Sequence, residues 1–462
     1  MKNFDYDCLI IGAGPAGYAA SLKLAKNKKK VCVIESVNAG GTCLNKGCIP
    51  TTLLLNTAEF IKKLKYCSEF GVDLPCGYKI NLNKIIARKN NVVDIHKKGI
   101  MQSFKSFKID FIEGSASFID EHTVSIILSG SNNKRIIAAE YIIIAAGGIS
   151  FVPDNFKIDN KYFFTTEQIL DIVEIPKKLA IIGGGVTGCE FAYFFNELGS
   201  EVLLIENADK ILPINLDEDI RKIFIRELKK NKINVLTGSN ILANEIVDSE
   251  INLKFDNGSV IKTEKALLTL GRRGASSGLN LETLGISVNQ KGFIQVNEYY
   301  QTHFSNIFAV GDIAGKYLYA HTASAEGSSV ADFILGNGEN FDFKHIPFTI
   351  FTYPEIGWSG LTEEEAVKFE IPYKKGVFHF RTSGRAHTLG EISGLVKLLT
   401  DSRTGYIIGA HIIGSRATDL IHTITLAMKK NIKISELTEL IAAHPSMTES
   451  IVEAANIIDE EL

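Results

Sequence analysis

The sequence predicts an α/β protein that contains two copies of one strand–turn–helix unit and a separate C-terminal α+β domain. Three observations support this prediction. A glycine-rich pattern occurs twice with identical spacing, and 462 residues suffice for about three domains. From about residue 344 the glycine-rich units give way to alternating apolar segments, Gly394–Leu399 and Tyr406–Ile413, and to a helix-like stretch, Thr418–Lys430.

Each copy of the repeat consists of an apolar run, a tight glycine turn, a helical stretch and a second apolar run that ends in an acid. Every landmark of the second copy follows its counterpart by 171 residues. The landmarks are Gly12, Gly14, Gly17 and Glu35 in the first copy, and Gly183, Gly185, Gly188 and Glu206 in the second.

In such a unit the first glycine makes the turn, the second lets the backbone approach a pyrophosphate, and the third lets the helix pack on the strand. The pyrophosphate rests on the helix N-terminus, and the acid accepts ribose hydroxyl hydrogens. A lone glycine motif is also typical of a surface turn. Two complete units predict two Rossmann-like domains that bind one dinucleotide each.

A third segment, Ser305–Asp312, has the pattern of a short buried strand that ends in Gly-Asp. Asp312 is either a turn or cap residue or a carboxylate at the C-terminal edge of a strand, where open α/β sheets bind ligands. We favour the second interpretation, which makes the first domain discontinuous. The expected domains are residues 1–148 with 271–343, residues 149–270, and residues 344–462.

Composition and charge exclude several classes of protein. Hydrophobic residues make up 45% and charged residues 22%, which excludes a disordered, collagenous or coiled-coil chain. A net charge of −3 gives no indication of a nucleic-acid or membrane partner, and the longest uncharged run, Cys8–Leu22, is too short to span a membrane. The acidic start, Asp5 and Asp7, is unlike a secretion signal, and seven sparse cysteines indicate a reducing compartment. We therefore expect a cytoplasmic protein.

Two cysteines, Cys43 and Cys48, follow the first repeat unit closely. A disulfide needs Cα atoms roughly 4.4–6.8 Å apart, whereas residues five apart in an ideal helix lie roughly 8 Å apart. The segment must therefore bend, and Gly47 permits the bend. Two unrelated buried thiols are the alternative. The place beside a nucleotide unit favours a redox pair, and no second cysteine pair or histidine cluster indicates a metal site.

A dithiol cycle also needs a base. Among ten histidines, His444 is followed five residues later by Glu449, a carboxylate that can orient the imidazole ring. Spacing alone leaves open that His444 is a surface residue or a cap.

With these motifs the sequence resembles the flavin disulfide reductases, and most closely the dihydrolipoamide dehydrogenases, over essentially the whole chain. Residues Gly40–Pro50 resemble the redox-disulfide motif, and His444–Glu449 resembles the family's His-Pro-Thr/Ser-x-Ser/Thr-Glu dyad. Three later segments resemble the family's flavin-domain and interface motifs: Val310–Asp312, Ala320–Gly327 and Tyr353–Ile356. Leu270–Arg273 resembles the strand end that closes the nicotinamide domain.

The resemblance implies a role for each matched residue. FAD would be held by the first glycine motif, Glu35 and Asp312, and NAD by the second glycine motif, Glu206 and Gly271. Cys43 would exchange disulfides with the substrate, and Cys48 would form the thiolate that contacts the flavin. His444, oriented by Glu449, would act as base at the disulfide of the other subunit, so that a homodimer, formed through the C-terminal domain, is required. The implied cofactor-binding set also includes Thr42, Ala116, Ala146, Gly147, Gly148, Glu190, Leu318, Ala320 and His321.

Three positions depart from the family pattern. Thr52 stands where a lysine usually pairs with the glutamate matched by Glu190. Ala146–Gly148 stands where the family commonly has Thr-Gly-Ser or Ala-Gly-Ser. Ala442 occupies a position that often holds another histidine, in addition to the one matched by His444. Without a cation partner, Glu190 either stays ionised beside the flavin, which would disfavour reduction, or takes up a proton, because a desolvated carboxylate has a raised pKa. The alternative is that Lys46 supplies the cation.

The implied function is the oxidation of protein-bound dihydrolipoyl groups through the disulfide and FAD, with reduction of NAD⁺. The partner would be the lipoyl domains of the acyltransferase component of a 2-oxo acid dehydrogenase complex. Two alternatives are a related reductase with another thiol or a metal substrate, and a low-activity flavoprotein scaffold. The carboxylate of Glu206 disfavours NADP, and the chain has no C-terminal cysteine pair of the mercuric-reductase kind. The intact cysteine pair and the dyad disfavour the inactive scaffold.

Overall fold

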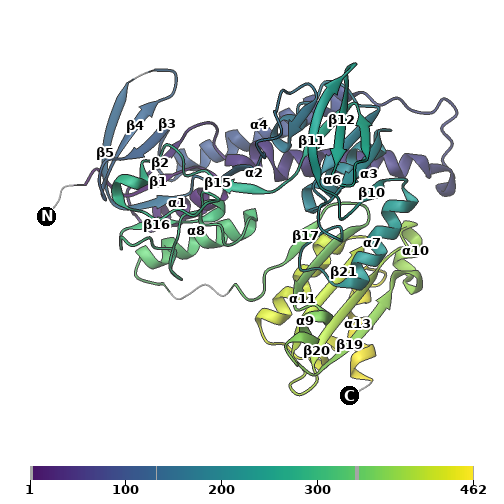
Figure 1. Ribbon diagram of the computed structural model, residues 1–462. Helices are drawn as coiled ribbons and strands as arrows, with labels where there is room; N and C mark the ends of the chain where they lie inside the picture. Colours follow the sequence, from purple (N-terminus) through teal and green to yellow (C-terminus); the bar gives the residue numbers. More distant parts are fainter. Residues whose placement is uncertain (1–3, 132, 339–342, 461–462) are drawn as a thin grey trace.

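The computed structural model describes residues 4–131, 133–338 and 343–460, and its strands form three main sheets (Figure 1). The first sheet has the order β1-β2-β3-β4-β5-β16, with β1 also paired to β5. Its strands are β1 (Tyr6–Ile11), β2 (Val31–Glu35), β3 (Asp110–Phe118), β4 (Thr123–Leu128), β5 (Lys134–Ile144) and β16 (Ile307–Ala309). The pairs β1–β2, β2–β3, β1–β5 and β5–β16 are parallel, and β4 is antiparallel to both β3 and β5.

Helix α1 (Pro15–Lys26) follows the first glycine turn and packs against α8 (Ala320–Ile334). The two helices meet at Gly327, where a Cβ would lie 2.2 Å from the carbonyl oxygen of Ala16. Strand β16 and helix α8 thus return to the first unit after the chain has left it. We propose the sequence-derived boundaries given above as the domain boundaries of the protein.

The second sheet is entirely parallel, with the order β10-β9-β8-β14-β7. Its strands are β7 (Phe163–Thr165), β8 (Lys178–Ile182), β9 (Glu201–Ile205), β10 (Asn234–Leu236) and β14 (Lys265–Leu268). Helix α6 (Val186–Glu197) follows the second glycine turn, and α7 (Glu218–Lys230) precedes β10. A small antiparallel sheet of β11 (Ile241–Val247), β12 (Glu250–Phe255) and β13 (Val260–Thr263) is inserted before β14.

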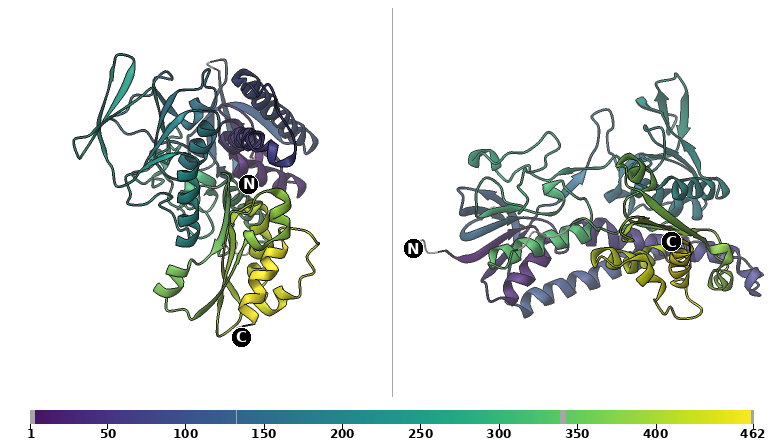
Figure 2. Two further views of the ribbon diagram at one scale, coloured as in Figure 1. Left: turned by 90° about the vertical axis from the view of Figure 1, so that its right-hand side faces the viewer. Right: turned by 90° about the horizontal axis from the view of Figure 1, so that it is seen from below.

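The third sheet is antiparallel, with the order β17-β18-β21-β20-β19. Its strands are β17 (Phe348–Ile350), β18 (Glu355–Gly360), β19 (Tyr373–His379), β20 (Leu395–Asp401) and β21 (Ile407–Gly414). Helices α11 (Ala417–Lys429) and α13 (Glu449–Asp459) pack on this sheet (Figure 2). Because each helix has one apolar face, the packing buries a core of aliphatic side chains between the sheet and the helices.

Two long helices, α3 (Cys48–Lys65) and α4 (Leu82–Ser106), run from the first unit toward the other two (Figures 1 and 2). Helix α3 packs against α6, and one apolar cluster joins Leu54 of α3, Phe191 of α6 and Trp358 of β18. A buried ion cluster adds to this junction, since Nζ of Lys397 lies within 3.0 Å of carboxylates of Asp217, Asp219 and Glu363. No helix of the described residues is long and apolar enough to cross a membrane.

Candidate active site

The two glycine turns have nearly the same geometry. Gly12 and Gly183 have φ angles of 109° and 114°, a region that strongly favours glycine. A Cβ on Gly17 would lie 1.9 Å from the carbonyl oxygen of Gly12, and a Cβ on Gly188 would lie 1.9 Å from that of Gly183. The third glycine of each motif is therefore required by the close approach of helix and strand.

The acids at the ends of β2 and β9 also have equivalent contacts. Glu35 accepts hydrogen bonds from the backbone N–H groups of Ala13 at 2.9 Å and Val37 at 3.0 Å. Glu206 accepts them from Gly184 at 2.7 Å and Ala208 at 2.9 Å. Each carboxylate is thus fixed beside its glycine turn, where its remaining lone pairs can accept ribose hydroxyls.

A cavity of about 230 Å³ lies beside the second turn. Gly183 belongs to its lining, together with Phe156, Asn207, Ser239 and Leu270. These residues come from separate loops of the second unit, and no spacing in the sequence indicates that Phe156 or Ser239 reaches the site. The cavity can take the part of a dinucleotide that lies beyond the pyrophosphate.

The redox cysteines lie where two helices meet. Cys43 belongs to α2 (Gly41–Lys46) and Cys48 begins α3. Gly47 between them has φ −142° and ψ −114°, so the helix breaks there, as the sequence predicts. Both residues are free thiols, and each acts on the other. The interaction between the two side chains raises the pKa of Cys43 and lowers the pKa of Cys48, so that ionisation is favoured at Cys48 over Cys43.

Two carboxylates act electrostatically on Cys48: Asp312, just after β16, and Glu190 on α6. Glu190 is 9% exposed and accepts a hydrogen bond from the backbone N–H of Phe351 at 3.0 Å. Burial raises its pKa to about 7, against the opposing effect of that hydrogen bond. Among the described residues no cation is one of the groups that shift the pKa of Glu190, and Lys46 is exposed.

Asp312 is also largely buried, and burial raises its pKa against the opposing charge of Arg272. Gly14 and Gly41 lie close together, since a Cβ on Gly41 would lie 2.6 Å from Cα of Gly14. The first glycine turn and the helix of Cys43 therefore meet at the N-terminus of α1. A carboxylate, the cysteine pair and this helix N-terminus in one unit suit the flavin half and the pyrophosphate of FAD.

The predicted base is distant from the cysteines of its own chain. Nδ1 of His444 lies 2.8 Å from Oε1 of Glu449, and the backbone N–H of Ser446 donates to Oε2 of Glu449 at 2.7 Å. The hydrogen bond with His444 lowers the pKa of Glu449. The His444 side chain is 82% exposed, and Figure 1 shows α13, which begins at Glu449, well apart from α2. One chain therefore orients the histidine but does not bring it to the disulfide.

The remaining predicted residues belong to the first unit or to the strands that leave it. Thr42 belongs to α2, Ala116 is buried in β3, and Ala320 and His321 begin α8. Leu318 is 41% exposed. Ala146, Gly147, Gly148 and Gly271 lie next to the two crossing strands β6 (Gly148–Ser150) and β15 (Arg272–Gly274) or within them.

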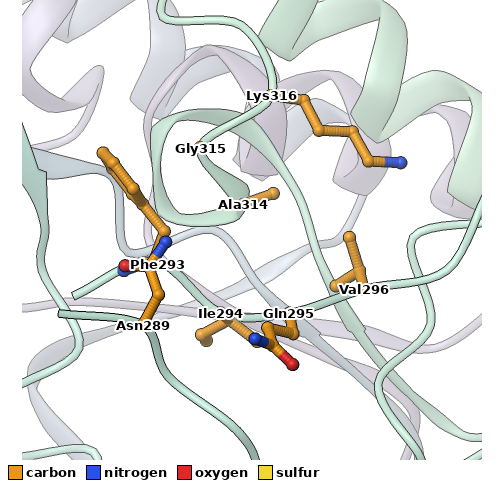
Figure 3. Close-up of a pocket in the computed structure, with 8 residues that line it drawn as sticks. All are labelled: Asn289, Phe293, Ile294, Gln295, Val296, Ala314, Gly315 and Lys316. Atoms are coloured by element: carbon orange, nitrogen blue, oxygen red, sulfur yellow. The ribbon is translucent and has the colours of Figure 1, made fainter. Parts of the chain in front are cut away.

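A second cavity, of about 380 Å³, lies in the first unit (Figure 3). Phe293 and Lys316 lie on opposite sides of it in the figure. Lys316 is already engaged, because its Nζ donates to the carbonyl of Asn297 at 3.0 Å and lies 4.1 Å from the Tyr300 ring centre. No predicted site residue lines this cavity. In the described ranges no three His, Cys, Asp or Glu side chains gather as a metal site would require.

Comparison with known families agrees with this geometry. Residues 6–327 match the model of the pyridine nucleotide-disulphide oxidoreductases, and residues 346–455 match the dimerisation domain of the same family. The chain belongs to the pyridine nucleotide-disulphide oxidoreductases. The predicted fold class and resemblance are confirmed, as are FAD and NAD, which this family uses. The dimerisation domain supports a homodimer.

Individual oxidoreductases of this family are similar over nearly the whole chain. A dihydrolipoyl dehydrogenase of Chlamydia pneumoniae is 36% identical over 455 residues, which are 98% of this chain and 96% of that protein. One of Bacillus subtilis is 35% identical over 451 residues, 96% of this chain and 97% of that protein. Among solved structures, LpdA of Mycobacterium tuberculosis has a TM-score of 0.92 at 25% identity, covering 97% of this chain and 99% of its own. The HOCl-induced flavoprotein disulfide reductase RclA of Escherichia coli has a TM-score of 0.89 at 27% identity, covering 98% and 100%.

Proposed function

We propose that this chain is a dihydrolipoyl dehydrogenase, which oxidises protein-bound dihydrolipoyl groups and reduces NAD⁺. The observation that carries the proposal is the cysteine pair at the break between α2 and α3, with the lowered pKa at Cys48, in a unit that also holds the first glycine turn. We assign Cys43 as the thiol that exchanges with the substrate and Cys48 as the thiolate. Relatives at 35–36% identity over nearly the full length have this activity in their names, which supports the choice of substrate.

In the oxidised enzyme a substrate thiolate would attack Sγ of Cys43, which breaks the Cys43–Cys48 bond and releases Cys48 as a thiolate. The second substrate thiol would then displace Cys43, forming the lipoyl disulfide and leaving both cysteines reduced. Bound FAD would supply the acceptor for the two electrons and pass them to NAD⁺.

The protons of the substrate require a base, and we assign this role to His444 of a second copy of the chain. The Glu449 carboxylate holds Nδ1, which leaves Nε2 for the substrate. Exposure of His444 and its separation from α2 within one chain support an active site that two subunits share.

The glycine motifs, Glu35 and Glu206 would bind the two cofactors as their geometry suggests. We further propose that the partner is the lipoyl domain of an acyltransferase component of a 2-oxo acid dehydrogenase complex. The sparse cysteines support the cytoplasm as the compartment.

Steady-state assays test the proposal. Wild-type protein should turn over dihydrolipoamide with NAD⁺ faster than with NADP⁺, and should reduce oxidised glutathione or Cu(II) poorly. Cys43→Ser should lose lipoamide turnover but keep electron transfer from NADH to a dye, because the flavin site and Cys48 remain. The matched control is Cys76→Ser, an exposed cysteine outside the pair that should leave both activities unchanged. Preference for glutathione or Cu(II) would contradict the proposed substrate.

A further inference from the structure

The first and second units are joined by two short crossing strands, β6 and β15, which pair antiparallel with Arg272 opposite Ser150. The side chain of Arg272 lies where these strands pass the C-terminal edge of the first sheet. It is 21% exposed, so its charge must be balanced largely by protein groups.

Arg272 contacts three segments that are far apart in the sequence. Its Nε lies 2.9 Å from Oδ2 of Asp312, an ion pair without an aligned N–H hydrogen bond. One Nη donates to the carbonyl oxygen of Gly148, and the other lies 3.8 Å from Oε1 of Glu167 in the second unit. The guanidinium therefore bridges a carboxylate at the flavin side of the site and a carboxylate of the nucleotide unit.

Glu167 is itself rigidly held. The hydroxyl of Ser150 donates to both of its oxygens at 2.8–2.9 Å, and the hydroxyl of Thr165 donates to one at 2.6 Å. Burial opposes ionisation of Glu167, but these hydrogen bonds outweigh it and keep its pKa below the ordinary value. Glu167 is thus a fixed anion that anchors one end of Arg272.

The main chain also leaves room for this arginine. A Cβ on Gly148 would lie 3.3 Å from Nε of Arg272, 3.3 Å from Cβ of Asp312 and 2.9 Å from the carbonyl oxygen of Arg273. A side chain at position 148 would crowd both partners of the ion pair. The glycine is therefore suited to the placement of Arg272 against Asp312.

From these contacts we infer that Arg272 is a positioning residue for the FAD site: it fixes the carboxylate of Asp312, balances its charge, and ties it to the second unit through Glu167. The inference rests on the proposed function only in taking FAD as the occupant of the first unit. The guanidinium fork suits this role because it can hold several oxygens in a fixed geometry at once.

Arg272→Met tests the inference, with Arg273→Met as the matched control. Arg273 is the next residue and equally charged, but it is exposed and lies over the ring of Phe151. In the holoenzyme without substrate, Arg272→Met should raise the FAD dissociation constant about tenfold or more. It should also make the flavin midpoint potential more negative, because the Asp312 charge is no longer balanced and opposes reduction. Arg273→Met should leave both quantities near their wild-type values.

Asp312→Asn completes a double-mutant cycle. If Arg272 acts through Asp312, the potential shift of Arg272→Met should largely vanish in the Asp312→Asn background. Arg272→Lys, which keeps the charge but not the fork, should recover much of the potential and less of the FAD affinity, and it serves if Arg272→Met does not fold. Equal effects of Arg272→Met and Arg273→Met, or an undiminished shift in the Asp312→Asn background, would overturn the inference. Neither the FAD dissociation constant nor the flavin midpoint potential requires a thiol substrate for its measurement. A lack of dihydrolipoamide turnover would therefore contradict the proposed function and not the role of Arg272.

Discussion

Glu190 should be a buried acid that is largely protonated below neutral pH, and Glu190→Gln tests this directly. The side chain lies between the second unit and the third, with the Phe351 N–H as its hydrogen-bond donor, and burial raises its pKa to about 7. Glutamine has nearly the same shape and keeps an acceptor for Phe351, but it does not titrate. The variant therefore removes one titration with little change in packing.

The direction of the stability change with pH follows from the raised pKa of Glu190. Between the ordinary value of 4.5 and about 7 the folded state binds a proton more tightly than the unfolded chain. The stabilising contribution of the protonated group is fully present below the unfolded pKa and is lost as the pH rises through the folded pKa. At about 1.4 kcal/mol per unit, a shift to about 7 is worth about 3 kcal/mol. Glu190→Gln should gain stability relative to wild type by up to this amount between about pH 4.5 and about pH 8.

Thermal melting of the two holoproteins across this pH range measures the effect, and the melting temperature of the variant should rise by several degrees relative to wild type. Glu326→Gln is the matched control, because burial also raises the pKa of Glu326 to about 7, but its partners are Gly311 and Tyr300. Both variants should flatten the pH profile of the melting temperature. Only Glu190→Gln should increase the thiolate–flavin charge-transfer absorbance above pH 7, since of these two glutamates only Glu190 acts on Cys48. A Glu190→Gln melting profile parallel to wild type at all pH values would refute the reasoning.

Three further predictions concern the base, the nucleotide and the missing lysine. His444→Ala should lower kcat for dihydrolipoamide about 10²–10⁴-fold with unchanged FAD content. Mixing it with Cys43→Ser protomers should restore some activity if the site is shared, and near-normal turnover of the single variant would make His444 a surface residue. Glu206→Gln keeps an acceptor for Gly184 but removes the negative charge, so it should shift the kcat/KM ratio toward NADP⁺. The reason is that the Glu206 carboxylate and the 2′-phosphate of NADP⁺, at about 4 Å, repel each other by roughly 4 kcal/mol at an effective dielectric of 20. An unchanged ratio would mean that Glu206 does not contact the ribose. Thr52 lies one helical turn after Cys48, and Thr52→Lys would place a positive charge there that favours the reduced flavin. A redox titration should therefore show the flavin midpoint potential raised by roughly tens of millivolts. A large fall of this potential in Lys46→Ala would instead show that Lys46 already supplies the cation.

Much of the site could be predicted from the sequence because its signals are local. A positive φ at Gly12 and Gly183, and the lack of space at the third glycine of each motif, are requirements that only glycine meets. The break between Cys43 and Cys48 follows from the geometry of an ideal helix. Each of these requirements concerns residues that are close together in the sequence.

Other parts of the site had no such signal. The ion pair of Arg272 with Asp312 joins residues 40 positions apart, and its anchor, Glu167, comes from another unit. Sequence spacing cannot reveal these contacts, because they depend on how β6 and β15 cross at the edge of the first sheet.

The sequence by itself therefore determined the two nucleotide turns, the acids that follow them and the bend that pairs the cysteines, since backbone sterics and helical periodicity act over a few residues. Only the tertiary structure decided the charge states around them. The pKa of Glu190 is raised because the folded chain buries it, against the opposing hydrogen bond from Phe351 of the third unit, and the pKa of Cys48 is lowered by its interaction with Cys43. The physical reason is that a pKa depends on desolvation and on nearby charges, and distant segments bring these to the site only when the chain has folded.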